Sequence, residues 1–145
     1  EETLIQHSKY IDHVLLHNNQ SPYTTALIVP SKEAIKRALA EKQLQAHSPE
    51  AHEEAIRLIQ NEIARFKTGG EHQDMFPDRW LPATFAILPD GFTEQNGFVN
   101  STMKVVRGKV EKHYEDRIQY LYTPEGKNTF NGMNKDTVKE ILTRS

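Results

Sequence analysis

The chain has 145 residues, of which 37% are hydrophobic and 26% are charged, a composition typical of one folded globular domain. Its formal net charge is -2 and it contains no long basic run, so nucleic acid is not an expected partner. The absence of cysteine excludes disulfides and thiolate metal sites, and no apolar run approaches the roughly 20 residues of a membrane-spanning helix.

Residues 1–8 have the pattern of the last turns of a helix with no capping residue before them, so we expect an upstream part of the protein to be missing. Residues 11–17 and 24–29 are short, apolar and branched, which predicts two buried strands. Because turn-forming residues separate them at positions 18–22, the two strands are expected to form an antiparallel hairpin.

Two helices are predicted next. Ser31 is expected to cap the first helix, which runs to about Leu44. Ser48 is a good N-cap for the second, and Pro49 lies in its first turn, where the missing N–H is harmless. Apolar residues at spacings of three and four place one face of this helix in the core until residues 68–70 end it.

The second half of the chain is expected to contain one more strand and two more helices. Residues 80–88 predict the strand, with Pro82 at an edge or among its first residues. A tight turn is expected at Asn96-Gly97, and apolar residues in segment 110–121 mark the helix that follows. Asn134 is predicted to cap a short final helix.

Together these elements predict an α+β fold. Helices are mixed with a few short strands, and the first two strands are expected to be antiparallel. We therefore expect residues 1–145 to form a single small domain whose helices pack on a short, mostly antiparallel sheet.

The histidine spacings do not predict a metal site. His13 and His17 would lie about 13 Å apart in a strand at about 3.3 Å per residue, which is too far for one ion. His47 and His52 lie on either side of a predicted helix start, and His72 with Asp74 lies in a loop without a third ligand. We expect structural or solvated histidines and no bound metal.

Two further patterns have structural explanations. Gly69-Gly70 follows a predicted helix, whereas a phosphate loop normally precedes one, so the pair is interpreted as a helix C-cap. The carboxylates Glu50, Glu53 and Glu54 complement the positive end of a helix dipole, which explains them better than acid–base catalysis does.

The remaining candidate for chemistry is the segment 92–107. It begins with Phe92-Thr93, continues through the Asn96-Gly97 turn to Thr102 and Lys104, and has a basic residue, Arg107, three positions after that lysine. This order and spacing resembles the carboxy-terminal signature of long-chain acyl-coenzyme A synthetases, which belong to the adenylate-forming, or AMP-binding, superfamily. Two earlier segments are similar to the opening helix-to-strand junction and the second strand of that family: residues 9–14 and 25–30.

The segment also departs from the family pattern. Asn100-Ser101 stands where a threonine-proline pair is common, and Met103 replaces the glycine that precedes the lysine in the wider superfamily. Residues 71–79 and the tail after Tyr122 carry no signature of the family.

The resemblance implies that the chain is the carboxy-terminal lid domain of a larger enzyme. That enzyme would use ATP and Mg²⁺ to convert a long-chain fatty acid to an acyl-adenylate, and would then transfer the acyl group to coenzyme A. Lys104 would be the catalytic residue, with Thr102 and Arg107 as supporting candidates. The N-terminal domain would carry the acyl pocket, nucleotide loops and hinge, so this domain alone should be inactive and bind none of these cofactors. The enzyme would lie in the cytoplasm, or peripherally at a membrane.

The chemistry of adenylation explains why a lysine is needed. Carboxylate attack on the α-phosphate of ATP brings two anions together, so an ammonium between them favours the transition state. Without the surrounding motif, Lys104 would be interpreted as an exposed lysine at a strand end. Two alternatives stay open: a non-catalytic module that binds a protein or membrane surface, and an adenylate-forming enzyme that uses another acceptor.

Overall fold

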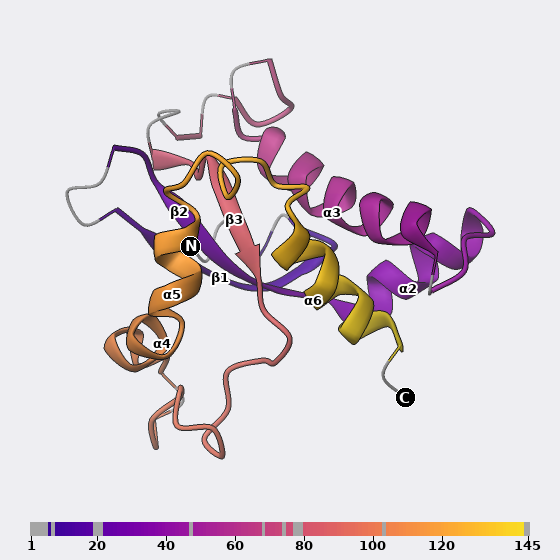
Figure 1. Ribbon diagram of the computed structural model, residues 1–145. Helices are drawn as coiled ribbons and strands as arrows, with labels where there is room; N and C mark the ends of the chain where they lie inside the picture. Colours follow the sequence, from indigo (N-terminus) through magenta and orange to yellow (C-terminus); the bar gives the residue numbers. More distant parts are fainter. Residues whose placement is uncertain are drawn as a thin grey trace.

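Figure 1 shows the computed structural model of the chain, which contains a three-stranded sheet in the order β1-β2-β3. It describes residues 6, 8–18, 22–46, 48–67, 69–73, 75–76, 80–102 and 104–143. β1 (Ile11–His17) and β2 (Thr25–Pro30) pair antiparallel, which confirms the predicted hairpin. Most of the helix predicted in residues 1–8, and most of the loop predicted at 18–22, lie outside the described residues.

The third strand joins the sheet in parallel. β3 (Thr84–Ile87) pairs with β2, and the chain reaches it by a crossover through α2 (Lys32–Glu41) and α3 (Pro49–Ala64). A crossover of this length allows parallel strands, whereas a tight hairpin turn joins only antiparallel ones. The α+β class is therefore confirmed, and the short sheet is mixed, with one antiparallel and one parallel pairing. β3 is shorter than the predicted 80–88 because Pro82 precedes the ladder and cannot donate to it.

The crossover helices begin largely as predicted. The Ser48 hydroxyl accepts a hydrogen bond of 3.2 Å from the Ala51 N–H and so caps α3. Ser31 occupies the N-cap position of α2, but its side chain makes no capping hydrogen bond. α3 ends at Ala64, before the predicted end at 68–70.

The helices of the second half differ from the prediction in two respects. The apolar residues of segment 110–121 belong to two short helices, α4 (Arg107–His113) and α5 (Glu115–Tyr120), which are separated by Tyr114. The last helix, α6 (Gly132–Thr143), begins before Asn134, so the prediction that Asn134 caps it was wrong. Asn131 caps it instead, because its Oδ1 accepts a hydrogen bond of 2.9 Å from the Asn134 N–H.

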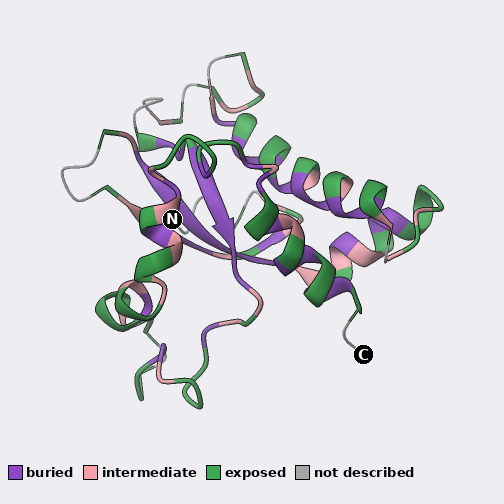
Figure 2. Ribbon diagram, in the orientation of Figure 1, coloured by how far each residue is buried: buried purple, intermediate pink, exposed green. Residues whose placement is uncertain are grey.

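Helices cover both faces of the sheet, and β2 and β3 are buried along their length, whereas β1 is buried only in part (Figure 2). Ile28 and Ile87 point to the face covered by α2, α3 and α6. Leu27 and Ala86, one position away in each strand, point to the face covered by α4 and α5. Because successive side chains enter apolar layers on opposite faces of the sheet, the sequences of the buried strands are continuous apolar runs.

Asn134 has a different function: it covers the free edge of β3. Its Oδ1 accepts a hydrogen bond of 2.9 Å from the Ile87 N–H, and its Nδ2 donates one of 2.9 Å to the Phe85 carbonyl. Arg117 adds hydrogen bonds to the Ile87 carbonyl at 3.3 Å and to Asn134 Oδ1 at 3.0 Å. Since Asn134 is fully buried, these side chains take the place of a fourth strand.

Among the described residues, no helix is sufficiently long and apolar to cross a membrane.

Candidate functional site

Lys104 lies on a small hairpin between Phe98 and Val106. The loop that contains this hairpin connects β3 to α4 (Figure 1). Val99 and Val105 face each other in an antiparallel bridge, and the Val106 N–H donates a hydrogen bond of 2.8 Å to the Phe98 carbonyl. Phe98 and Val99 are buried, whereas Lys104 is exposed. The base of the hairpin is thus anchored in the core, and its outer part presents the lysine to solvent.

Aromatic rings hold the base of this hairpin. Phe98 packs edge-on against Phe92 with ring centroids 6.0 Å apart, and contacts His113 and Tyr114 at 5.2 and 5.9 Å. Burial, together with the nearby Asp90 carboxylate, raises the pKa of the Tyr114 phenol, which therefore stays neutral at physiological pH. The base is consequently a packed, largely apolar support for the polar loop.

Asn100 organises the outer part of the hairpin. Its Oδ1 accepts hydrogen bonds from the Lys104 N–H at 3.0 Å, the Thr102 N–H at 3.0 Å and the Thr102 hydroxyl at 2.7 Å. Its own N–H donates a hydrogen bond of 2.9 Å to the Lys104 carbonyl. In the sequence, Asn100 stands out only as a departure from the family pattern. The available signal was an asparagine two residues before a threonine, which favours a side chain that bonds the backbone two residues on.

A second asparagine forms the turn before the hairpin. Asn96 Oδ1 accepts hydrogen bonds of 3.1 Å from the N–H groups of Thr93 and Phe98, and its Nδ2 donates one of 2.7 Å to the Gly91 carbonyl. Gly97 has a φ of 81°, in the left-handed region where a glycine has no steric cost. The predicted Asn96-Gly97 turn is confirmed.

This turn gives a local test of the structure. Replacing Gly97 by alanine should destabilise the chain by about 1–2 kcal/mol, because a Cβ is strained at positive φ. Gly91→Ala is the matched control, since Gly91 has no positive φ and a Cβ there would meet no atom within 4 Å. Urea unfolding followed by circular dichroism compares the two variants. Equal stabilities would contradict the described turn.

The three residues selected from the sequence occupy different surroundings. Lys104 has no ion-pair partner among the residues that the structure describes, so its ammonium is available to an external anion. Thr102 lies on the same loop, where its hydroxyl is bonded to Asn100. Arg107 begins α4 and donates a hydrogen bond of 2.7 Å from Nη1 to the Leu16 carbonyl in β1. The loop therefore brings Lys104 and Thr102 together, while Arg107 connects α4 to the sheet.

Two of the described histidines form polar contacts with protein groups. His17 Nδ1 lies 2.7 Å from a carboxylate oxygen of Glu111, and His52 Nε2 lies 3.0 Å from the Ala46 carbonyl. Within the described part of the chain, no three side chains gather in a way that could hold a metal ion. Two members of the histidine patterns lie outside the described residues: His47 and Asp74.

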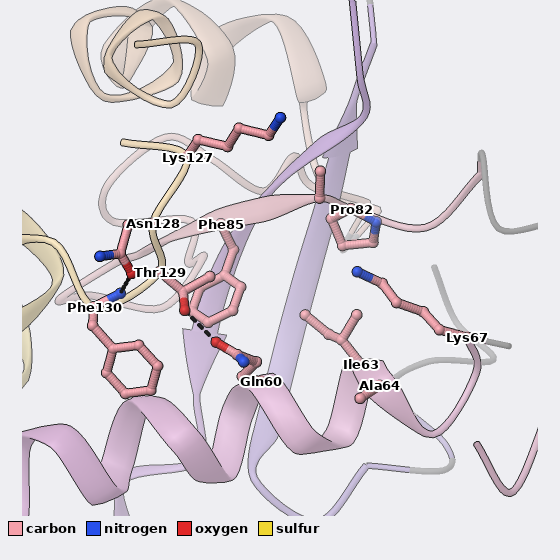
Figure 3. Close-up of a pocket in the computed structure, with 11 residues that line it drawn as sticks. Gln60, Ile63, Ala64, Lys67, Pro82, Phe85, Lys127, Asn128, Thr129 and Phe130 are labelled. Carbon is pink, nitrogen blue, oxygen red and sulfur yellow. Dashed lines mark hydrogen bonds between the residues drawn. The ribbon is translucent and has the colours of Figure 1, made fainter. Parts of the chain in front are cut away.

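A cavity of about 450 Å³ lies between the end of α3, the start of β3 and the segment before α6 (Figure 3). Apolar side chains such as Ile63 and Phe85 line it, and Lys67 and Lys127 contribute its charged groups. None of the three candidate residues lines this cavity. Lys104 and Thr102 instead lie on the exposed surface of the hairpin.

Comparison of sequences identifies two relatives among characterised proteins, whereas no model of a protein family matches the chain. The chain is 25% identical over 126 residues to long-chain acyl-CoA synthetase 8 of Arabidopsis thaliana, covering 83% of this chain and 17% of the relative. It is 24% identical over 126 residues to fatty acyl-CoA synthetase B of Dictyostelium discoideum, covering 84% and 18%. The chain thus spans less than a fifth of the length of these relatives.

Comparison of structures identifies adenylation domains. The fold matches the adenylation domain of a carboxylate reductase from Mycobacterium chelonae with a TM-score of 0.63 and 26% identity, over 83% of this chain and 17% of that one. It also matches the A-PCP didomain of a carboxylic acid reductase from Segniliparus rugosus, solved in complex with AMP. There the TM-score is 0.57 and the identity 25%, over 83% and 15% of the two chains. The sequence comparison thus finds acyl-CoA synthetases, and the structure comparison finds adenylation domains of carboxylic acid reductases.

Proposed function

We propose that the chain belongs to the adenylate-forming superfamily and is the carboxy-terminal lid domain of an acyl-CoA synthetase, because its sequence relatives are acyl-CoA synthetases and its fold matches an adenylation domain. Lys104 is its catalytic residue. The observation that supports this role is an exposed ammonium without an ion-pair partner in the described part of the chain, on a residue whose backbone N–H is hydrogen-bonded to Asn100.

In the proposed reaction, a carboxylate oxygen of the fatty acid forms a bond to the α-phosphorus of ATP, and pyrophosphate leaves. Mg²⁺ supplies charge neutralisation on the phosphates when it is bound with ATP. Lys104 carries three N–H donors on a compact charge, which suits it to bridge the carboxylate and an α-phosphate oxygen. Its contact strengthens as negative charge develops on the phosphoryl oxygens, so it favours the transition state over the bound substrates.

A lid suits this chemistry because Lys104 is required in only one of two steps. The hairpin presents the ammonium outward, so a second domain must bring the nucleotide and the fatty acid to it. The relatives are much longer than this chain, which is consistent with such a domain in the same protein. Withdrawal of the lid after adenylation would clear space for coenzyme A to attack the acyl carbon and release AMP. The proposed substrate is a long-chain fatty acid, and the proposed location is the cytoplasm or the surface of a membrane.

The experiment is the Lys104→Ala variant of the full-length parent enzyme, supplied with ATP, Mg²⁺ and a long-chain fatty acid such as palmitate. Pyrophosphate release reports adenylate formation, which should nearly disappear. Unchanged pyrophosphate release would reject the proposed role and favour a non-catalytic module that binds a protein or a membrane.

An acceptor other than coenzyme A is the second candidate, because the two structural neighbours described above are carboxylic acid reductases. The unmodified full-length parent distinguishes the two, since an acyl-CoA synthetase should form palmitoyl-CoA when coenzyme A is added to its adenylate. An adenylate that persists in the presence of coenzyme A would favour the other acceptor.

A further inference from the structure

We infer that Asn100 is a positioning residue for Lys104, acting through the backbone of the hairpin on the direction of the lysine side chain. The inference rests on the proposed function of Lys104.

The geometry of Asn100 supports this role. One residue bonds both peptide groups of Lys104: its Oδ1 accepts from the Lys104 N–H at 3.0 Å, and its N–H donates to the Lys104 carbonyl at 2.9 Å. Holding both groups restricts the φ and ψ angles of Lys104, which set the direction of its Cα–Cβ bond. The same Oδ1 also accepts hydrogen bonds from the N–H and the hydroxyl of Thr102, which lies between Asn100 and Lys104 in the sequence.

The effect should appear in catalysis more than in stability. Asn100, Thr102 and Lys104 are all exposed, so water can replace the lost hydrogen bonds and little folding free energy depends on them. A side chain that stabilises a transition state must instead be held within a fraction of an ångström. Misplacement by about 1 Å can lower a rate by roughly 100-fold. A loosened hairpin would place the ammonium correctly for only part of the time.

The contacts suggest a pair of test variants of similar size. All three side-chain contacts use Oδ1 as an acceptor, so a carboxylate can reproduce them, whereas a leucine cannot. Asn100→Asp is therefore the conservative variant and Asn100→Leu the disruptive one. Ser101→Ala, at the next exposed position, is the matched control.

The experiment is a double-mutant cycle in the full-length parent, in the presence and absence of Lys104→Ala. Single-turnover rates are measured for adenylate formation and for thioester formation from supplied acyl-adenylate. Asn100→Leu should slow adenylate formation about tenfold or more while leaving thioester formation and the melting temperature almost unchanged. Asn100→Asp should retain more of the rate than Asn100→Leu, because it keeps the acceptor, but less than the native rate, because it adds a negative charge near the ammonium. Ser101→Ala should match the native enzyme. In the Lys104→Ala enzyme, Asn100→Leu should have no further effect, because the group that it positions is absent.

The possible failures can be told apart. If Lys104→Ala abolishes adenylate formation but Asn100→Leu is fully active, the positioning role is rejected and the proposed function stands. A further loss from Asn100→Leu in the Lys104→Ala enzyme, or an equal loss in both half-reactions, would show a general structural role and overturn the inference. If Lys104→Ala leaves adenylate formation intact, the proposed function fails, and the inference fails with it.

Discussion

Replacing Lys104 by alanine in the proposed full-length synthetase is expected to slow adenylate formation by about 100- to 1,000-fold, the usual effect of removing one charge-stabilising donor from an active site. Lys104 has no ion-pair partner in the described part of the chain, so its removal leaves no unpaired carboxylate there and should not destabilise the fold. The loss should therefore appear in the rate constant of the chemical step, with little change in the melting temperature.

Two further substitutions make this prediction specific. Lys109→Ala removes another exposed lysine five residues later, in α4, and should leave adenylate formation within about twofold of the native rate, because surface lysines away from a site contribute little. Lys104→Arg keeps the charge but replaces a compact ammonium with a larger planar group, so it should recover only part of the rate. A loss in Lys109→Ala as large as that in Lys104→Ala would indicate a general charge effect and would contradict the assigned role.

Asn134→Ala is expected to give the largest loss of folding stability, about 3 kcal/mol or more. The substitution leaves the Ile87 N–H and the Phe85 carbonyl at the edge of β3 without their hydrogen-bond partner, in a site where Asn134 is fully buried. Each unsatisfied buried group costs about 1–3 kcal/mol. Chemical denaturation measures the change in the free energy of unfolding.

The matched controls for this prediction lie in the same helix. Lys139→Ala changes an exposed position of α6 and should alter stability by less than about 0.5 kcal/mol. Asn134→Asp keeps an acceptor for the Ile87 N–H and for Arg117, but it places a buried carboxylate oxygen against the Phe85 and Thr129 carbonyls, so it should also be clearly destabilising. A value for Asn134→Ala no larger than that for Lys139→Ala would show that the edge of β3 does not depend on this amide.

The parts of the fold that depend on local pattern could be predicted from the sequence. The apolar runs predicted the β1/β2 hairpin, and the Ser48-Pro49 pair predicted the start of α3, because capping and burial involve neighbouring residues. The parallel pairing of β3 with β2 could not be predicted, since it joins segments separated by two helices. Asn134 was misassigned for a related reason: an asparagine near a helix start resembles a cap, and only the tertiary structure shows that its amide is used by β3.

The candidate site, too, could be predicted from the sequence only in part. The order of residues in segment 92–107 was enough to select Lys104, and the turn at Asn96-Gly97 followed from its dipeptide. The hydrogen bonds of Asn100 and the hydrogen bond from Arg107 to β1 could not be predicted, because each depends on the three-dimensional path of the loop. The assignment of Lys104 as the catalytic residue stays a prediction.

The role proposed for Lys104 is tested most directly by the single-turnover rate of thioester formation in the full-length Lys104→Ala enzyme, supplied with acyl-adenylate and coenzyme A. If Lys104 serves only adenylation, this rate should lie within a few-fold of the native value, while adenylate formation by the same variant should be slower by about 100-fold or more. Loss of both half-reactions to the same extent would contradict a role for Lys104 that is confined to adenylation.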